Sequence, residues 1–230
     1  MPVAWTSFFF FFFFFFFFFF FTKAINQSIN QSNQSFKQTG ASSGIGAAVA
    51  KLFAKEGASV AATGRNEAAL AALVEDIASA GGSAKFFAAD VTDDAAVAGV
   101  VDSAVREFGA LDILVNNAGV LQGGATDDAT MDNWDFNFSV NARGPFCFLT
   151  QAIPHLKKSA AAEGSAEGGA GGGAGGFRTA AVVNVSSVNG QQSFGGTVSY
   201  CAAKAALDMV TRCASVDLAP HGVSCRHFVS

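Results

Sequence analysis

A tyrosine and a lysine four residues apart have the types and spacing needed for acid–base chemistry. Tyr200 and Lys204 lie in a stretch with helical patterning, where an i, i+4 spacing places both side chains on one face. A free tyrosine has a pKa of about 10, too high for proton transfer at neutral pH. A neighbouring ammonium favours the phenolate. Such a pair could give a proton to a carbonyl oxygen or take one from an alcohol.

A glycine-rich stretch offers a second kind of chemistry. Residues Thr39 to Gly46 read Thr-Gly-Ala-Ser-Ser-Gly-Ile-Gly and open a predicted helix. The three glycines permit a tight turn and let the backbone approach a phosphate closely. The N-terminus of the helix adds free N–H groups and a positive dipole end, which favour an anion. The spacing differs from the Gly-x-Gly-x-x-Gly of other dinucleotide folds, and the turn alone does not identify its ligand.

The elements that would position these residues alternate along the chain from Thr39 onward. This alternation predicts right-handed βαβ units, and the expected fold class is α/β with a Rossmann-like doubly wound parallel sheet. Strands are expected at 59–63, 84–88, 111–115 and 179–185, and helices at 44–56, 67–80, 93–108, 131–156 and 199–218. Gly144 and Pro145 could bend the long helix expected over 131–156.

The N-terminal residues 1–38 are a low-complexity segment, with unbroken Phe from Phe8 to Phe21 and then a polar Ile-Asn-Gln-Ser repeat. The Phe run is shorter than the roughly 20 apolar residues of a membrane-spanning helix, and no Lys or Arg precedes it as in a signal peptide. Membrane insertion and secretion are therefore disfavoured. Phe36 is the only apolar residue just before Thr39, so we expect no first strand there, because a central parallel strand is nearly all apolar.

The remaining composition limits the possible partners. Net charge is −4 without a basic face, which argues against nucleic-acid binding. The four cysteines have no metal or redox spacing, so we expect no metal site, reduced thiols and a cytoplasmic protein. One oxidoreductase domain is predicted over 39–230. It contains a flexible Gly/Ala-rich insertion at 159–176, which is too poor in apolar residues to order itself.

Several motifs in the same order resemble those of the short-chain dehydrogenase/reductase family, over about residues 39–223. The Thr39–Gly46 turn is followed by Asp90-Val91, by Asn116-Asn117-Ala118-Gly119 and by the Tyr-x-x-x-Lys pair. The resemblance implies a catalytic set in which Tyr200 moves the proton and Ser187 hydrogen-bonds the substrate oxygen. It also implies that Lys204 supports the tyrosine and that Asn141 holds a water against the lysine.

The resemblance also implies a bound nicotinamide dinucleotide. Gly64 stands where an NAD-preferring enzyme would place an Asp for the ribose hydroxyls, and Arg65 could pair with a 2′-phosphate. NADP(H) is therefore preferred, with NAD(H) as the second possibility, and Asp90 is expected to bind the adenine. The implied cofactor-binding residues are Gly40, Ser42, Ser43, Gly44, Ile45, Gly46, Arg65, Asp90, Val91, Asn117, Ala118, Gly119, Tyr200 and Lys204.

The expected function is an NADP(H)-dependent oxidoreductase acting on a small carbonyl/alcohol pair, such as a ketone or 3-oxoacyl reductase. The family continues beyond residues 221–223 with a strand, a Pro-Gly turn and helices over the substrate, whereas this chain stops at Ser230. We therefore expect a sheet that is incomplete at both ends and truncated at the C-terminus.

The alternative function is that of a catalytically defective or fragmentary relative, which at most binds nucleotide or associates with partners. Family members pair through two long helices, so a homodimer or homotetramer is expected.

Overall fold

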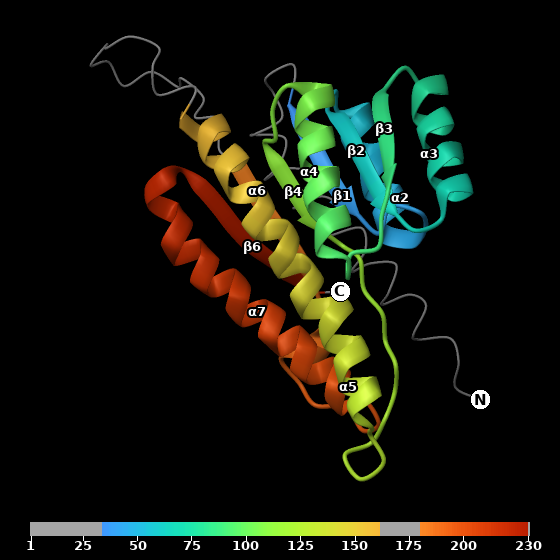
Figure 1. Ribbon diagram of the computed structural model, residues 1–230, viewed down its shortest axis with the longest axis vertical. Coiled ribbons are helices and arrows are strands. Elements are labelled where there is room, and N and C mark those ends of the chain that lie inside the picture. The colour runs from blue at the N-terminus through green and yellow to red at the C-terminus, as the bar shows by residue number, and fades with distance from the viewer. Residues whose placement is uncertain (1–33, 162–179, 230) are drawn as a thin grey trace, which may run out of the picture.

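A six-stranded parallel sheet forms the middle of the protein in a computed structural model that describes residues 34–161 and 180–229 (Figure 1). The strand order is β3-β2-β1-β4-β5-β6, so the chain runs outward from β1 to β3 and then returns to place β4 beside β1. This reversal opens a crevice at the carboxyl ends of β1 and β4, where ligands bind in open α/β sheets. The strands are β1 (Ser35–Thr39), β2 (Ser59–Gly64), β3 (Ser83–Ala88), β4 (Ile113–Asn116), β5 (Ala180–Ser186) and β6 (Val223–Val229).

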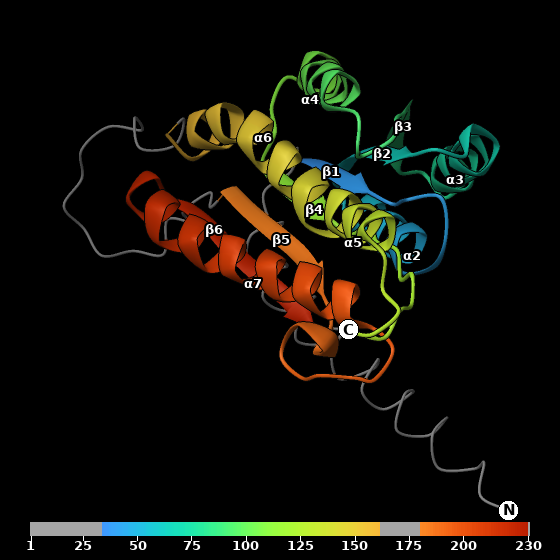
Figure 2. The ribbon, with the colours of Figure 1, turned by 60° about the horizontal axis from the view of Figure 1, so that its bottom comes forward.

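Helices cover the two faces of the sheet. Phe53 and Leu70, from α2 and α3, pack in one buried cluster with Ile113, whereas Phe148 and Leu156, from α6, pack in the other. Figures 1 and 2 show α6 and α7 running side by side along the second face. The helices are α2 (Gly44–Lys55), α3 (Glu67–Ser79), α4 (Asp94–Phe108), α5 (Met131–Phe138), α6 (Gly144–Ala161) and α7 (Val198–Leu218).

Strand β4 shows why the sheet separates two cores. Ile113 and Val115 belong to the cluster beneath α2 and α3, and Leu114 belongs to the opposite cluster. This alternation follows from the two-residue period of a strand. All four residues of β4 are buried, as expected of a parallel strand covered on both faces.

The expectation that no strand precedes Thr39 is wrong. Strand β1 lies in the centre of the sheet, with Phe36 opposite Val60 of β2 and Ile113 of β4. Its five residues are all buried although four are polar. The backbone of β1 forms hydrogen bonds to β2 on one side and to β4 on the other. A prediction based only on how many residues are apolar does not take this pairing into account. The predicted domain boundary at residue 38/39 therefore falls inside this strand.

Local contacts accommodate most of the buried polar side chains of β1. Phe36 stacks on Phe53 with ring centroids 3.9 Å apart. The Ser35 hydroxyl donates to the Ala110 carbonyl, the Ser35 backbone N–H donates to the Asp112 carboxylate at 2.7 Å, and Gln38 Nε2 donates to the Gly46 carbonyl at 2.7 Å. These bonds compensate part of the cost of removing polar groups from water.

The central residue of β1 is less well accommodated. The Lys37 side chain is fully buried, and its Nζ lies 4.2 Å from the centroid of the Phe148 ring without a hydrogen-bond partner. Burial holds the pKa of Lys37 well below its usual range, against the opposing influence of Asp102 and Cys147. Inside the fold the neutral amine is thus stabilised relative to the ammonium, compared with a lysine in water.

The long helix expected over 131–156 is divided into α5 and α6 by a π-helical turn at Ser139–Arg143. The interruption of the helix thus falls just before Gly144 and Pro145. Pro145 lies just after the π-helical turn, and because it has no N–H, one hydrogen bond of the continuous helix is not made at this position. Gly144 is tightly packed, since an added Cβ would lie 2.8 Å from the Val91 carbonyl oxygen.

The predicted insertion at 159–176 and the predicted low-complexity Phe run lie partly or wholly outside the described residues. Ser159 belongs to the last turn of α6 and donates to the Leu111 carbonyl at 3.0 Å, so the first residues of the expected insertion are helical. Residues 162–176 of that insertion, and the Phe run, lie outside the described residues. In the described part of the chain, no helix combines the length and apolar character needed to cross a membrane.

The strand expected to be lost near the C-terminus is present. Strand β6 pairs with β5 along its whole length, from Val223 opposite Ala180 to Val229 opposite Ser186. Val223 and Cys225 contribute to the core beneath α6 and α7. The sheet therefore continues one strand beyond β5, and β6 forms its edge.

Candidate active site and dinucleotide cleft

The turn between β1 and α2 is built on glycine. Gly40 and Gly44 have φ angles of +64° and +55°, which favour glycine over other residues. An added Cβ on Gly40 would lie 2.8 Å from Ala118 Cα, and one on Gly46 would overlap the Gly40 carbonyl oxygen. A Cβ on Gly44 would meet nothing within 4 Å, so this glycine borders open space.

The start of helix α2 leaves donors free. Ser43 is the residue that precedes the helix, and its side chain makes no capping hydrogen bond. The first turn of α2 carries no acidic residue. The backbone N–H groups at this end are therefore available to an anion.

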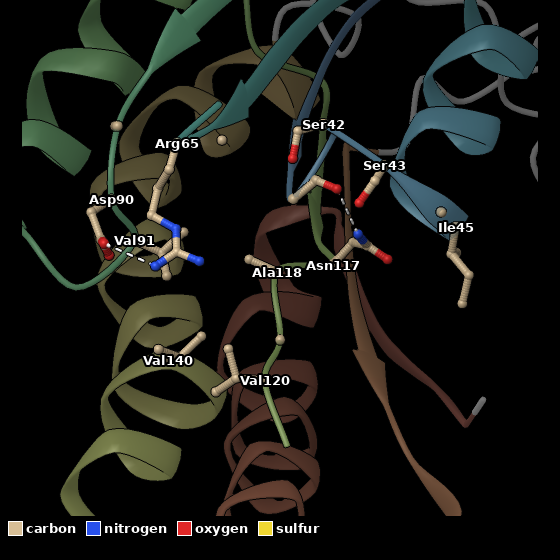
Figure 3. Close-up of a pocket in the computed structure, with 15 residues that line it drawn as sticks. Ser42, Ser43, Ile45, Arg65, Asp90, Val91, Asn117, Ala118, Val120 and Val140 are labelled. Carbon is tan, nitrogen blue, oxygen red and sulfur yellow. Dashed lines mark hydrogen bonds and ion pairs between the residues drawn. The ribbon is translucent and has the colours of Figure 1, made fainter. Parts of the chain in front are cut away.

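The end of β4 is tied to the same turn. The Thr39 hydroxyl oxygen accepts from the backbone N–H groups of Asn117 and Ala118 at 3.0 and 3.1 Å. The Asn117 side-chain amide donates to the Gly40 carbonyl at 3.2 Å (Figure 3). Hydrogen bonds thus hold together the carboxyl ends of β1 and β4, which form the bottom of the crevice.

A cleft of about 370 Å³ opens above this junction. In Figure 3, Arg65, Asp90 and Val91 lie on the opposite side from Ser42, Ser43 and Ile45, with Ala118 between them. The cleft is lined by Gly40, Ser42, Ser43, Gly44, Ile45, Gly64, Arg65, Ala89, Asp90, Val91, Asn117, Ala118, Gly119, Val120 and Val140.

Charged side chains mark the far end of the cleft, where β2 and β3 end. An Arg65 guanidinium nitrogen lies 3.8 Å from an Asp90 carboxylate oxygen, and both side chains are well exposed. The backbone N–H and hydroxyl of Thr92 donate to the same carboxylate at 2.9 and 2.7 Å. The Thr92 N–H is the main cause that lowers the pKa of Asp90, with Arg65 contributing less, against the effect of burial. Asp90 is therefore a fixed hydrogen-bond acceptor.

Asn141 and Lys204 meet beside Gly119, beyond the other end of the cleft. Asn141 is fully buried in the π-helical turn; its Oδ1 accepts from the Val120 N–H at 3.1 Å and its Nδ2 donates to the Val120 carbonyl at 2.9 Å. A Cβ on Gly119 would lie 3.2 Å from Asn141 Oδ1 and 3.5 Å from Lys204 Nζ. The π-helical turn thus places the Asn141 amide beside Gly119, the glycine that the Lys204 ammonium also approaches.

Lys204 is held at the centre of the candidate catalytic group. Its ammonium donates to the Val185 carbonyl at 2.9 Å and lies 5.8 Å from the centroid of the Tyr200 ring. Burial lowers the pKa of Lys204 to about 8, although the Asp208 carboxylate opposes this shift. The charged form of Lys204 therefore predominates below about pH 8.

Ser187 and Tyr200 come from neighbouring elements. Ser187 follows the last residue of β5 and caps a short 3-10 turn, Val188–Gly190. That turn packs against α7, since a Cβ on Gly190 would lie 3.0 Å from the Lys204 carbonyl carbon. Tyr200 lies in the first turn of α7 and is half-buried.

The structure therefore places the predicted site residues in two adjoining groups. Most of the predicted cofactor residues line the cleft, whereas Gly46 packs beneath the turn, and Tyr200 and Lys204 lie beyond Gly119. The sequence interpretation missed Ala89, Val120 and Val140 as lining residues. Each is adjacent in sequence to a predicted site residue, which is the signal that could have found them.

Comparison with known proteins gives a consistent result. The family model described as short chain dehydrogenase matches residues 38–229. A 2,5-dichloro-2,5-cyclohexadiene-1,4-diol dehydrogenase of Sphingobium indicum is 36% identical over 185 residues, which are 80% of this chain and 67% of that protein. D-threitol dehydrogenase of Mycolicibacterium smegmatis is 34% identical over 185 residues, or 80% of this chain and 64% of that protein.

Solved structures share the fold as well. A dehydrogenase/reductase from Sinorhizobium meliloti superposes with a TM-score of 0.74 at 33% identity, covering 89% of this chain and 74% of that chain. A Serratia marcescens short-chain dehydrogenase/reductase variant gives 0.74 at 32% identity, over 85% of this chain and 73% of that chain. The described sheet is thus the Rossmann-like sheet of these enzymes.

Proposed function

This chain belongs to the short-chain dehydrogenase/reductase family of NAD(P)-dependent oxidoreductases, and we propose that it uses NADP(H) to interconvert a carbonyl and an alcohol. The two adjoining groups of residues described above support this proposal, since one suits a dinucleotide and the other suits proton transfer. The single observation that carries it is the convergence of Asn141 and Lys204 at Gly119, where the cleft ends.

The residues of the cleft fit a dinucleotide. The turn excludes side chains at Gly40 and Gly46 but opens at Gly44, where the uncapped start of α2 offers N–H groups to a diphosphate. Asp90, whose carboxylate is held by Thr92, would accept a hydrogen bond from the adenine amino group. Asn117, Ala118 and Gly119 would line the path toward the nicotinamide.

The NADP(H) preference rests on the end of β2. Gly64 offers no carboxylate to pair with the adenosine ribose hydroxyls, and a Cβ there would lie 3.4 Å from Ser42 Oγ. Arg65 is largely exposed at the mouth of the cleft, and its ion pair with Asp90 is long. The guanidinium is free to turn to a 2′-phosphate, which it would bind more strongly than a single exposed carboxylate.

The catalytic roles follow from the second group. Reduction of a carbonyl adds a hydride to carbon and a proton to oxygen, and alcohol oxidation removes both; the nicotinamide, when bound, supplies or accepts the hydride. Tyr200 gives its phenolic proton to the substrate oxygen, and a protonated Lys204 stabilises the negative charge left on the phenolate. Ser187 donates a hydrogen bond to the same substrate oxygen as charge develops there. Asn141, fixed by its two hydrogen bonds to Val120, would hold a water against Lys204.

The proposed substrate is a small carbonyl or secondary alcohol. The relatives above are named as dehydrogenases of a cyclic diol and of threitol, both of which contain secondary alcohols. Ketones and 3-oxoacyl compounds are the corresponding substrates for reduction. A chain of this family that binds the nucleotide without turnover would be the catalytically defective alternative.

The test separates binding from turnover. We expect NADPH to bind the full chain in a fluorescence titration, with an affinity at least tenfold greater than that of NADH. We then expect absorbance at 340 nm to fall when a panel of diketones is added, and Tyr200→Phe to abolish this turnover while retaining measurable NADPH binding. Tight NADPH binding without any turnover would support the defective alternative, and absence of binding would overturn both proposals.

A further inference from the structure

Asn189 lies in the turn that follows the proposed catalytic serine. The Ser187 Oγ accepts from the Asn189 backbone N–H and faces the Asn189 side-chain Oδ1, each at 3.4 Å. The other end of the same amide reaches helix α7, where Nδ2 lies 3.3 Å from Thr197 Oγ1 and 3.5 Å from Cys201 Sγ. We propose that Asn189 is a positioning residue that holds the Ser187 hydroxyl in place relative to the helix carrying Tyr200.

The hydrogen bonds around the amide determine which end faces the serine. The Thr197 hydroxyl donates to the Phe194 carbonyl at 2.8 Å, so its single proton is already used. Its oxygen can therefore only accept from Asn189, which requires the NH₂ end of the amide on that side. The carbonyl end must then face Ser187, where it accepts the serine proton.

This arrangement prepares the serine to donate to a substrate. A hydroxyl has one proton and two lone pairs. The Asn189 backbone N–H occupies one lone pair of Ser187 Oγ, and the side-chain Oδ1 holds the proton in a long, weak bond. A substrate oxygen can replace Oδ1 as the acceptor while the N–H bond remains and strengthens the donation.

The turn is also fixed on α7 by close packing. A Cβ on Gly190 would lie 3.0 Å from the Lys204 carbonyl carbon and 3.1 Å from its oxygen, so the backbone of the turn rests directly on the helix. Asn189 adds the hydrogen bonds to Thr197 and Cys201 nearer the start of the helix. Asn189 and Gly190 thus set the position of Ser187 relative to Tyr200. Tyr200 itself lies one helical turn before Lys204 on α7.

This inference rests on the proposed catalytic role of Ser187, and a double-mutant cycle tests it. Asn189→Ala should lower kcat with a carbonyl substrate about tenfold, leave NADPH affinity unchanged, and have less than a twofold effect in a Ser187→Ala background. Ser215→Ala, which removes one exposed hydrogen bond to the Arg212 carbonyl on α7, is the control and should leave kcat unchanged. An equal effect of Asn189→Ala with and without Ser187 would overturn the inference.

A second measurement does not depend on activity. Burial opposes the thiolate of Cys201, whereas hydrogen bonding at the sulfur, including the bond from Asn189 Nδ2 at 3.5 Å, lowers the pKa of this thiol. The pH midpoint for alkylation of Cys201 by iodoacetamide, followed by mass spectrometry of its peptide, should therefore rise in Asn189→Ala. It should rise further in Asn189→Asp, because a carboxylate replaces the donor, and stay constant in Ser215→Ala.

The two measurements distinguish the possible failures. If no carbonyl is turned over by the unchanged protein, the proposed function fails, and a shifted alkylation midpoint still supports the assigned orientation of the Asn189 amide. An unshifted midpoint in both Asn189 variants overturns the inference whether or not the protein is active.

Discussion

The Asn141 amide oxygen and the Lys204 ammonium approach the same point above Gly119, where an added Cβ would lie 3.2 Å from one and 3.5 Å from the other. Neither group can move aside easily. Asn141 is held by two hydrogen bonds to Val120, and Lys204 by one to Val185. Residue 119 therefore controls how closely the cleft and the proposed catalytic group adjoin.

Gly119→Ala tests this contact. We expect a loss of roughly 1–3 kcal/mol in the free energy of unfolding, as for other overpacked sites, together with weaker NADPH binding. Gly99→Ala is the matched control, because an added Cβ on this exposed glycine of α4 meets nothing within 4 Å. The control should stabilise the protein by about 0.5–1 kcal/mol. Urea unfolding of both variants measures the difference, and equal stability would contradict the packing.

The lowered pKa of Lys204 predicts a pH-dependent stability. Its pKa falls from 10.5 in a free lysine to about 8 in the fold. The folded state therefore binds fewer protons in this range, so stability is greatest above pH 10.5, falls as the pH drops toward 8, and levels off below. The contribution is roughly 3 kcal/mol. Subtracting the unfolding curve of Lys204→Met from that of the unchanged protein, between pH 6 and 11, isolates it; a flat difference would contradict the shift.

Lys37 predicts a gain in stability on substitution. Its amine is buried without a hydrogen-bond partner against the Phe148 ring, and burial lowers its pKa strongly. Lys37→Leu removes an unsatisfied polar group and should raise the free energy of unfolding at pH 7 by about 1–3 kcal/mol. Lys55→Leu, at an exposed position of α2, should change it by less than about 0.5 kcal/mol. Thermal unfolding compares the two, and destabilisation by Lys37→Leu would be inconsistent with this buried site.

Arg65 and Gly64 predict a cofactor switch. Arg65→Ala should weaken NADPH binding about 10- to 100-fold, since a hydrogen-bonded charged group contributes about 1.5–3 kcal/mol, and should leave NADH binding nearly unchanged. Gly64→Asp should improve NADH binding, because its carboxylate would lie beside Ser42 at the end of β2. Arg106→Ala, on the exposed side of α4, serves as the control. Parallel titrations with both nucleotides measure the effect, and equal losses for NADPH and NADH would refute the assigned role.

The sequence predicted most of the fold because the relevant signals are local. Helix α4 starts where Asp93 accepts from the N–H groups of Ala95 and Ala96, and it ends at Gly109 with a φ angle of +79°. Apolar runs such as 113–115 revealed the buried strands. The motif residues could be placed because each follows a strand end or shares a helix face.

Strand β1 could not be predicted in the same way. Its residues are polar, and what places Phe36 and its neighbours in the centre is pairing with strands about 24 and 77 residues later, as between Phe36 and Val60 or Ile113. The order of apolar and polar residues in the sequence does not reveal which distant strands pair. Asn189 was missed for a related reason, since only the fold brings its amide to Thr197 and Cys201.

The central place of β1 determines how the sheet can assemble. Without Ser35–Thr39, the β2–β3 pair and the β4–β5–β6 group would share no strand-to-strand hydrogen bonds. The segment is among the first described residues to leave the ribosome, yet its second neighbour is synthesised much later. Folding must therefore wait for a distant contact, which slows it, and even a small change in these five residues would act on both halves of the molecule at once.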